Sequence, residues 1–370
     1  MTDLTSPVLF ERLQAANGAV IGLLTLNVEK TLNALSLEMV DLMQAQLSEW
    51  QDDEQVAAVF MRGAGDKAFC AGGDVQALYQ SMTATPGGPC EYAEAFFERE
   101  YRLDYLLHSY RKPVISWGHG IVMGGGLGVH AGARHKVVTE RTRFAMPEIG
   151  IGLFPDVGGT WFLSHMPGKT GMFVALTAAA LNASDALYLG LGNHFAHNDR
   201  QQEVVDALLK VDWQRNAVQN NGLVSRALAD LADSDLPEGN VEKNLALIND
   251  LCAGDDFADI VDAILAIDSD DKWLGNGVSA LAQGSPISAC AIYRQLTDGK
   301  ELPLADVFRF ELVLATNILR YPEFAEGVRA LLIDKDRQPR WRFPTVRAVP
   351  DSLMDQMFTP PWTNNPLADL

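Results

Sequence analysis

Apolar positions in the first 200 residues switch repeatedly between the spacing of strands and the spacing of helices. Runs that are apolar almost throughout, as buried strands are, cover residues 19–26, 56–61, 114–117 and 136–139. Between the first two runs, apolar residues recur on one helical face from Met39 to Trp50, and helical spacing returns over residues 91–110. This alternation predicts an α/β fold assembled from successive β-α-β units.

Beyond about residue 200 the strand pattern fades and helical spacing dominates. The expected helices cover residues 206–232, 241–263, 304–319 and 324–332. Breaks that are acidic or contain Pro and Gly, such as residues 234–239, separate them. We therefore predict a core of residues 1–200 followed by a mainly helical C-terminal region of residues 201–370.

The composition is strongly acidic, with 29 Lys and Arg against 48 Asp and Glu in 370 residues and a net charge of −19. This balance argues against nucleic acids and anionic membrane surfaces as partners, because both attract basic proteins. No apolar run approaches the roughly 18 residues of a membrane span. The first ten residues have no positive charge ahead of an apolar stretch, so export is not expected. The four cysteines lie far apart, which indicates a cytoplasmic protein without a zinc cage or a disulfide framework.

Two glycine-rich loops each follow an expected strand and precede a helical stretch. The first covers residues 62–74 and contains Gly72 and Gly73; the second covers residues 117–128 and contains three consecutive glycines. Small residues leave backbone N–H groups accessible to a polarised oxygen. The first loop alone is explained equally well as a tight turn without a ligand. Two such loops together favour an oxyanion hole, which needs donors that converge on one carbonyl oxygen.

The second loop has a rival interpretation. Residues 126–131 fit the dinucleotide-binding pattern G-x-G-x-x-[GA], and Glu148 follows about 20 residues later. However, Glu148 comes directly after Pro147 and not at an evident strand end, and the pattern leaves the first loop unexplained. A nicotinamide-dependent oxidoreductase is therefore the less favoured alternative.

Three acidic residues lie in apolar surroundings. Glu148 and Asp156 each follow a proline, and carboxylates in such company either have a raised pKa or find a donor, as catalytic acids do. A helix cap is the alternative for Asp156. Glu100 falls on the apolar stripe of its helix, so it should point inward, either to a site or to a buried salt bridge.

These residues and several longer motifs resemble the enoyl-CoA hydratase/isomerase (crotonase) superfamily, and within it the 3-hydroxyisobutyryl-CoA hydrolases. The superfamily marks are residues 68–74 (AFCAGGD) and the Gly124–Gly126 turn. The more selective marks are residues 97–101 (FEREY), 144–148 (FAMPE), 151–159 (IGLFPDVGG), 284–288 (GSPIS) and 326–341 (EGVRALLIDKDRQPRW). Matches near both ends extend the resemblance over nearly the whole chain.

The resemblance implies a crotonase-like spiral of ββα units that binds an acyl-CoA. It places the substrate's thioester carbonyl on the amides of Gly73 and Gly125, and it matches Glu148 to the family's catalytic glutamate. Asp156 occupies the position that is characteristically acidic in the hydrolases, and Glu100 matches a further acid that contacts the substrate. The expected reaction is hydrolysis of a short 3-hydroxyacyl-CoA thioester in valine catabolism, with Glu148 as nucleophile or general base and Asp156 as acceptor for the 3-hydroxyl.

The resemblance also sets expectations for partners and alternatives. Hydratases carry a second glutamate where this chain has Gly128, which argues against double-bond hydration on the same fold. No metal and no redox cofactor are expected, because coenzyme A is part of the substrate. Its phosphates need cations, and Lys67 beside the first glycine loop is the candidate. A non-catalytic acyl-CoA-binding protein is a further alternative. The sequence does not decide which acyl group is preferred or whether the protein forms a homo-oligomer.

Overall fold

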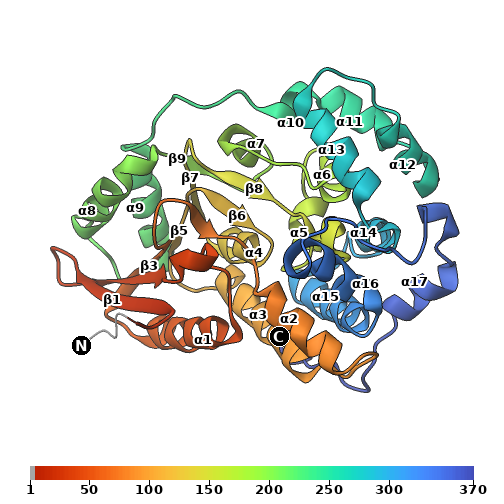
Figure 1. Ribbon diagram of the computed structural model, residues 1–370. Coiled ribbons are helices and arrows are strands. Elements are labelled where there is room, and N and C mark those ends of the chain that lie inside the picture. Colours follow the sequence, from red (N-terminus) through yellow and green to blue (C-terminus); the bar gives the residue numbers. More distant parts are fainter. Residues whose placement is uncertain (1–4) are drawn as a thin grey trace. The chain divides into compact units, whose positions relative to one another are not determined.

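A computed structural model describes residues 5–370 and divides them into two compact units (Figure 1). The first unit contains the residues up to Gly73, Arg102–Phe144 and Leu181–Asn240. The second contains Asp74–Tyr101, Ala145–Ala180 and Val241–Leu370. This division differs from the predicted boundary at residue 200, because the second unit combines early helices and turns with the C-terminal helices that pack on them.

The first unit is built on a six-stranded sheet with the strand order β1-β2-β3-β5-β7-β9. β1 is antiparallel to β2, and the other neighbouring strands are parallel. A smaller sheet contains β4, β6 and β8. The strands are β1 (Val8–Gln14), β2 (Val20–Leu26), β3 (Val56–Gly63), β4 (Ala68–Cys70), β5 (Val114–Gly118), β6 (Ile121–Met123), β7 (His135–Val138), β8 (Arg143–Ala145) and β9 (His194–Phe195). All four strands expected from the apolar runs are present, with ends within two residues of the prediction.

Helices cover both faces of the large sheet. Successive side chains of a strand point to opposite faces, and along β2 the position of Gly22 is filled by the ring of Trp50 from α1 (Leu37–Asp52). Ile21 and Leu23 belong instead to the hydrophobic core formed with α8 (Gln201–Leu209) and α9 (Ala217–Ala229). Figure 1 shows α8 and α9 together at one side of the strands. The remaining helices of this unit are the last part of α3 (Glu91–His108), α4 (Gly125–Gly132) and α7 (Ala183–Tyr188), with short 3₁₀ turns at Glu29–Thr31 and Asn198–Arg200.

The second unit is helical. Its early helices are α2 (Val75–Ala84), the first part of α3 (Glu91–His108), a 3₁₀ helix at Glu148–Ile151, α5 (Gly159–Ser164) and α6 (Thr170–Thr177). Its later helices are α10 (Asn240–Lys243, which begins on the last residue of the first unit), α11 (Leu245–Leu251), α12 (Phe257–Leu265), α13 (Lys272–Gln283), α14 (Pro286–Asp298), α15 (Leu304–Leu319), α16 (Pro322–Val328), a π-helical turn at Arg329–Ile333, a 3₁₀ turn at Val346–Ala348 and α17 (Asp351–Met357). In residues 5–370 no helix is both long and apolar enough to span a bilayer.

The predicted helices differ from the observed ones where polar side chains start new helices. The stretch 91–110 forms α3, and 304–319 is α15. The stretch 206–232 is instead two helices, because the Asn216 side chain accepts from Gln219 N and caps α9. The stretch 241–263 is divided among α10, α11 and α12, and Asp256 caps the last of these by accepting from Ala258 N and Asp259 N.

A chain that ends at residue 200 should be insoluble, because its early segments would lose the helices that pack on them. A Cβ at Gly327 would lie 2.2 Å from Ile151 O, and one at Gly284 would lie 2.8 Å from Ile149 Cγ1, so these C-terminal helices lie directly on the 3₁₀ helix. The ring of Phe173 is 5.7 Å from that of Trp273. Removing these partners exposes a contiguous apolar surface. Soluble yield and thermal unfolding of the fragment provide the test, and a soluble fragment with a cooperative transition would contradict the expectation.

Candidate active site

The two glycine-rich loops lie against each other in the first unit. Gly72 has φ +111°, and its carbonyl accepts from Leu35 N at 2.8 Å. A bridge between Leu35 and Gly73 holds the first loop in place. A Cβ at Gly72 would lie 3.4 Å from Met123 O and 3.9 Å from Gly125 N. Glycine is therefore suited to this position by its positive φ, and the second loop lies at ordinary contact distance from it.

The second loop ends at a helix start. Gly124 has φ +49° and precedes α4, and Gly125 is the first residue of that helix. The first four N–H groups of a helix have no acceptor within it, so the Gly125 amide is available. The dinucleotide-like residues 126–131 lie inside α4 and not in a strand-to-helix turn, which removes the basis of that alternative. Lys67 lies in the exposed turn just before β4, in the same unit.

The three candidate acids gather in the second unit. Glu100 lies on α3, Glu148 is the first residue of the 3₁₀ helix, and Asp156 lies in the turn before α5. Their exposures are 2%, 4% and 3%. Burial raises the pKa of both glutamates, and the charge of Asp156 adds to the rise in each. Glu148 and Asp156 therefore share one environment, which their spacing along the chain did not establish.

Tyr101 completes this cluster and was not anticipated from the sequence. Its hydroxyl donates to Asp156 Oδ2 at 2.7 Å, and its side chain is fully buried. Asp156 thus accepts from a side chain and does not cap α5, whose N-cap residue is Gly158 without a side-chain bond. Burial raises the pKa of Asp156 to about 7 even though the hydrogen bond from Tyr101 opposes the rise.

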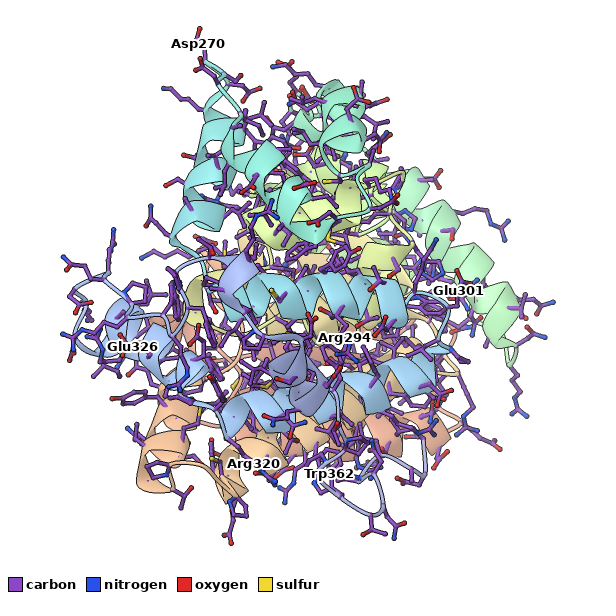
Figure 2. The ribbon with its side chains drawn as sticks, turned by 90° about the vertical axis from the view of Figure 1, so that its right-hand side faces the viewer. Asp270, Arg294, Glu301, Arg320, Glu326 and Trp362 are labelled. Atoms are coloured by element: carbon purple, nitrogen blue, oxygen red, sulfur yellow. The ribbon has the colours of Figure 1, made fainter. Side chains whose placement is uncertain are left out.

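Carboxyl groups dominate the cluster, and within residues 5–370 no cation is among the causes that shift the pKa of Glu100 or Glu148. Burial and the charges of neighbouring acids both raise the pKa of Glu100 and Glu148. The cations of α14 and α15 are engaged elsewhere: Arg294 pairs with Asp298 and Asp355, and Arg309 pairs with Asp306. Arg294 lies on the face of the second unit that Figure 2 shows. Among the described residues Glu100 Oε1 and Glu148 Oε2 have no hydrogen-bond partner, so the salt-bridge interpretation of Glu100 does not apply.

A fourth buried carboxylate, that of Glu311 on α15, lies beside the Asp156 turn. Its two oxygens accept from Gly158 N and Thr160 N, both at 2.8 Å. Burial raises the pKa of Glu311 to about 8, the charge of Asp156 adds to the rise, and the two backbone hydrogen bonds oppose it. The sequence does carry a signal for this residue, because Glu311 shares the apolar stripe of α15 with Val307 and Phe308, as Glu100 does on α3.

Comparison with known proteins decides the family. Residues 21–358 match the family described as Enoyl-CoA hydratase/isomerase. The chain belongs to this family. The 3-hydroxyisobutyryl-CoA hydrolases, mitochondrial, of Danio rerio and Homo sapiens are 35% and 33% identical to it. Both alignments cover 96% of this chain, and they cover 90% and 89% of the two relatives.

Solved structures confirm the predicted crotonase-like α/β fold of this hydratase/isomerase-family protein. A carnitinyl-CoA dehydratase from Mycobacterium thermoresistibile is 35% identical, with a TM-score of 0.84 and coverage of 95% of this chain and 96% of that one. An enoyl-CoA hydratase from Rhodobacter sphaeroides 2.4.1 is 30% identical, with a TM-score of 0.82 and coverage of 96% and 98%. The family resemblance seen in the sequence motifs is therefore confirmed as well.

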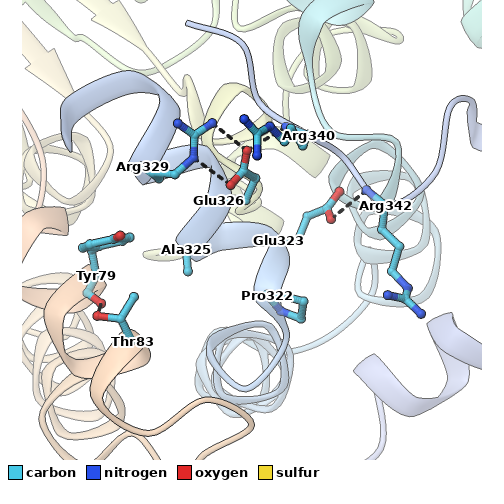
Figure 3. Close-up of a pocket in the computed structure, with 9 residues that line it drawn as sticks. All are labelled: Tyr79, Thr83, Pro322, Glu323, Ala325, Glu326, Arg329, Arg340 and Arg342. Carbon is cyan, nitrogen blue, oxygen red and sulfur yellow. Dashed lines mark hydrogen bonds and ion pairs between the residues drawn. The ribbon is translucent and has the colours of Figure 1, made fainter. Parts of the chain in front are cut away.

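The second unit of this family member also has a surface pocket of about 390 Å³ whose lining contains none of the clustered acids (Figure 3). Its acidic groups are already used by the protein. Glu326 accepts from Arg329 and from Arg340 N, and Glu323 accepts from Ser285 Oγ at 2.7 Å and Arg342 N at 3.4 Å. The acids at this pocket therefore have protein partners, in contrast to Glu100 Oε1 and Glu148 Oε2 of the cluster.

The raised pKa values predict that stability falls as the pH rises. Asp156 goes from 3.8 to about 7 and Glu311 from 4.5 to about 8. The folded state therefore binds protons that the unfolded state has already released. The stabilisation is complete below the unfolded-state pKa values of 3.8 and 4.5. It falls as the pH rises above them and is lost once the pH has passed the folded-state values of about 7 and about 8. We expect a lower Tm at about pH 8.5 than at about pH 7.

The window above pH 6.5 isolates the acids. Burial lowers the pKa of His130 from 6.5 to about 3 and that of His135 to about 4, so these side chains reduce stability only as the pH falls below 6.5. Thermal unfolding of Glu311→Gln is the control, because removing one raised carboxyl should flatten the decline. A Tm that is constant or rises between about pH 7 and about pH 8.5 would contradict the shifted acids.

Proposed function

We propose that this protein hydrolyses the thioester of a short 3-hydroxyacyl-CoA, with 3-hydroxyisobutyryl-CoA as its substrate. The observation that carries the proposal is the group of buried, uncompensated acids around Glu148 and Asp156 in a chain of this family. The relatives bear out the predicted enzyme class, since several proteins named 3-hydroxyisobutyryl-CoA hydrolase align over most of this chain.

In the proposed reaction, the amides of Gly73 and Gly125 hold the thioester carbonyl oxygen and stabilise the negative charge that develops on it. Removing one such donor typically costs about 3 to 4 kcal/mol of transition-state stabilisation. Glu148 takes a proton from a water molecule that attacks the carbonyl carbon, or attacks that carbon itself to give an anhydride that water then opens. Either way the C–S bond breaks, and the CoA thiolate leaves and is protonated.

Asp156 is assigned the recognition of the 3-hydroxyl group. One carboxylate oxygen, Oδ2, already accepts from Tyr101, so Oδ1 is the oxygen assigned to the substrate. With a pKa of about 7, Asp156 has a substantial ionised fraction near neutral pH and can act as an acceptor. Glu100, with its unpartnered Oε1, is the second group assigned to substrate contact.

Hydration of an enoyl-CoA is the second candidate, because the solved relatives include a carnitinyl-CoA dehydratase and an enoyl-CoA hydratase. The residue at the position of the hydratases' second glutamate weighs against it. That residue is Gly128, which is buried inside α4 and has no side chain to position a water molecule.

The finer assignments belong to the same proposal. Valine catabolism is the pathway that the proposed substrate implies. The cysteine usage predicts a cytoplasmic location, whereas the relatives are named as mitochondrial. Lys67, an exposed cation beside the first glycine loop, is assigned to the CoA phosphates, and the proposed reaction uses no metal or redox group.

A thiol-release assay tests the function. The purified protein is given 3-hydroxyisobutyryl-CoA, 3-hydroxypropionyl-CoA, isobutyryl-CoA and crotonyl-CoA, and free thiol is measured alongside loss of the enoyl absorbance. We expect rapid thiol release from the two hydroxylated esters and slow release from isobutyryl-CoA. Loss of the crotonyl absorbance without thiol release would establish hydration instead, and binding of all esters without turnover would indicate a binding protein.

A further inference from the structure

The turn that carries Asp156 has an unfavourable backbone conformation. Val157 has φ +54°, a left-handed value that β-branched residues rarely adopt, and Gly158 follows with φ +85°. Residues held in such regions persist only where the surroundings determine their conformation. The surroundings of this turn should therefore contain groups that hold it.

Two buried side chains from different helices hold the turn on both sides of Asp156. Gln295 of α14 donates from Nε2 to Pro155 O at 2.5 Å, on the N-terminal side, and also to Thr160 Oγ1 at 2.8 Å, beyond Asp156. On the C-terminal side, Glu311 of α15 accepts from Gly158 N and Thr160 N, both at 2.8 Å. Both side chains are fully buried. The backbone that flanks Asp156 is thus anchored at three points.

The two hydrogen bonds that Glu311 accepts favour its ionised form, whereas burial opposes that form. Glu311 has no cation among the groups that shift its pKa, and a buried carboxylate without one reduces stability. A carboxylate nevertheless offers an acceptor oxygen to each of two separate N–H groups, whereas glutamine of the same shape would offer only one. Because burial opposes the ionised form that makes both contacts, the contacts fit a role in holding the turn better than a role in stabilising the fold.

We propose that Glu311 and Gln295 are positioning residues that hold the Asp156 turn in the conformation that recognises the substrate's 3-hydroxyl. This inference rests on the proposed function of Asp156. Neither residue is expected to contact the substrate. Their contribution should therefore appear in the discrimination between hydroxylated and unhydroxylated esters.

Glu148 has a separate support, which supplies an internal comparison. Ser285 N donates to Ile149 O at 2.9 Å, and Ser285 Oγ donates to Glu323 Oε1 at 2.7 Å. The backbone bond ties the start of α14 to the 3₁₀ helix that begins at Glu148, and the Ser285 hydroxyl, which also accepts from Ser288 N at 3.1 Å, holds that backbone in place. Disturbing it with Ser285→Ala should lower turnover of all esters together, because Glu148 acts on every substrate.

The test compares kcat/KM for 3-hydroxyisobutyryl-CoA with kcat/KM for isobutyryl-CoA in Glu311→Gln and Gln295→Met. We expect the ratio to fall by at least about fivefold in each, since a displaced hydrogen bond has that order of effect. In the double variant Glu311→Gln/Asp156→Ala the ratio should fall no further than in Asp156→Ala, because both changes act on the same contact. If Glu311→Gln does not fold, Gln295→Met carries the test.

Thr316→Val is the matched control. Thr316 lies on α15, is as buried as Glu311, and its hydroxyl has no partner among the described residues. In Thr316→Val the ratio of kcat/KM for the two esters should equal that of the unmodified protein. An unchanged ratio in Glu311→Gln and Gln295→Met, beside a changed ratio in Asp156→Ala, would overturn the positioning role alone. An unchanged ratio in Asp156→Ala would overturn the recognition role of Asp156 and this proposal with it.

Discussion

Replacing Glu148 by glutamine should abolish thiol release from every acyl-CoA ester while leaving the protein folded. Glutamine keeps the shape of the side chain but can neither attack the thioester carbonyl nor take a proton from water. Loss of a positioned general base typically reduces the rate by about 100- to 10,000-fold. Substrate contacts elsewhere are unchanged, so the loss should fall on kcat and not on binding.

The stability of Glu148→Gln separates this explanation from simple damage. Burial and the charge of Asp156 raise the pKa of Glu148, which means that the surroundings oppose its ionised form. A neutral amide at that position should leave Tm unchanged or raise it. Thermal unfolding and CoA titration, measured beside single-turnover kinetics, provide the check. A variant that unfolds at a lower temperature, or one that keeps its kcat, would contradict the assignment.

Much of the fold could be predicted because local patterns determine it. The apolar runs identified β2, β3, β5 and β7, and helical spacing identified α3 and α15. The division into two units could not be predicted in this way, because it depends on contacts between residues far apart in sequence. Hydrophobic periodicity shows which face of an element is buried but not which distant element covers it.

The single acids of the candidate site could be predicted from the sequence, but their grouping could not. Glu100 was found because it interrupts the apolar stripe of a helix, and Glu148 and Asp156 because each follows a proline among apolar residues. Glu311 carries the same stripe signal on α15. Its contact with the Asp156 turn has no local signature, and the positive φ of Val157 runs against the preference of a β-branched residue. Sequence patterns therefore identify single acids, whereas their grouping requires the tertiary structure.

Replacing Asp156 by alanine should penalise hydroxylated substrates selectively. If Asp156 accepts a hydrogen bond from the 3-hydroxyl, its loss leaves that hydroxyl without its partner beside buried side chains. We expect kcat/KM for 3-hydroxyisobutyryl-CoA to fall by about 10- to 1000-fold. The loss for isobutyryl-CoA should be much smaller, because that ester makes no such bond. The decisive quantity is therefore the ratio of the two losses.

Asp156→Asn is the conservative comparison, since the amide keeps one acceptor oxygen but not the charge. Tyr101 donates to Oδ2 of Asp156, so in the asparagine variant Tyr101 and the substrate hydroxyl compete for a single oxygen. The ratio of kcat/KM for 3-hydroxyisobutyryl-CoA to kcat/KM for isobutyryl-CoA should lie between the ratio of the unmodified protein and that of Asp156→Ala. Steady-state kinetics near neutral pH give kcat/KM for both esters in the unmodified protein, Asp156→Asn and Asp156→Ala. Equal losses on both esters in Asp156→Ala would show that Asp156 serves the chemistry or the fold in general, because a group that reads only the hydroxyl cannot affect a substrate that lacks it.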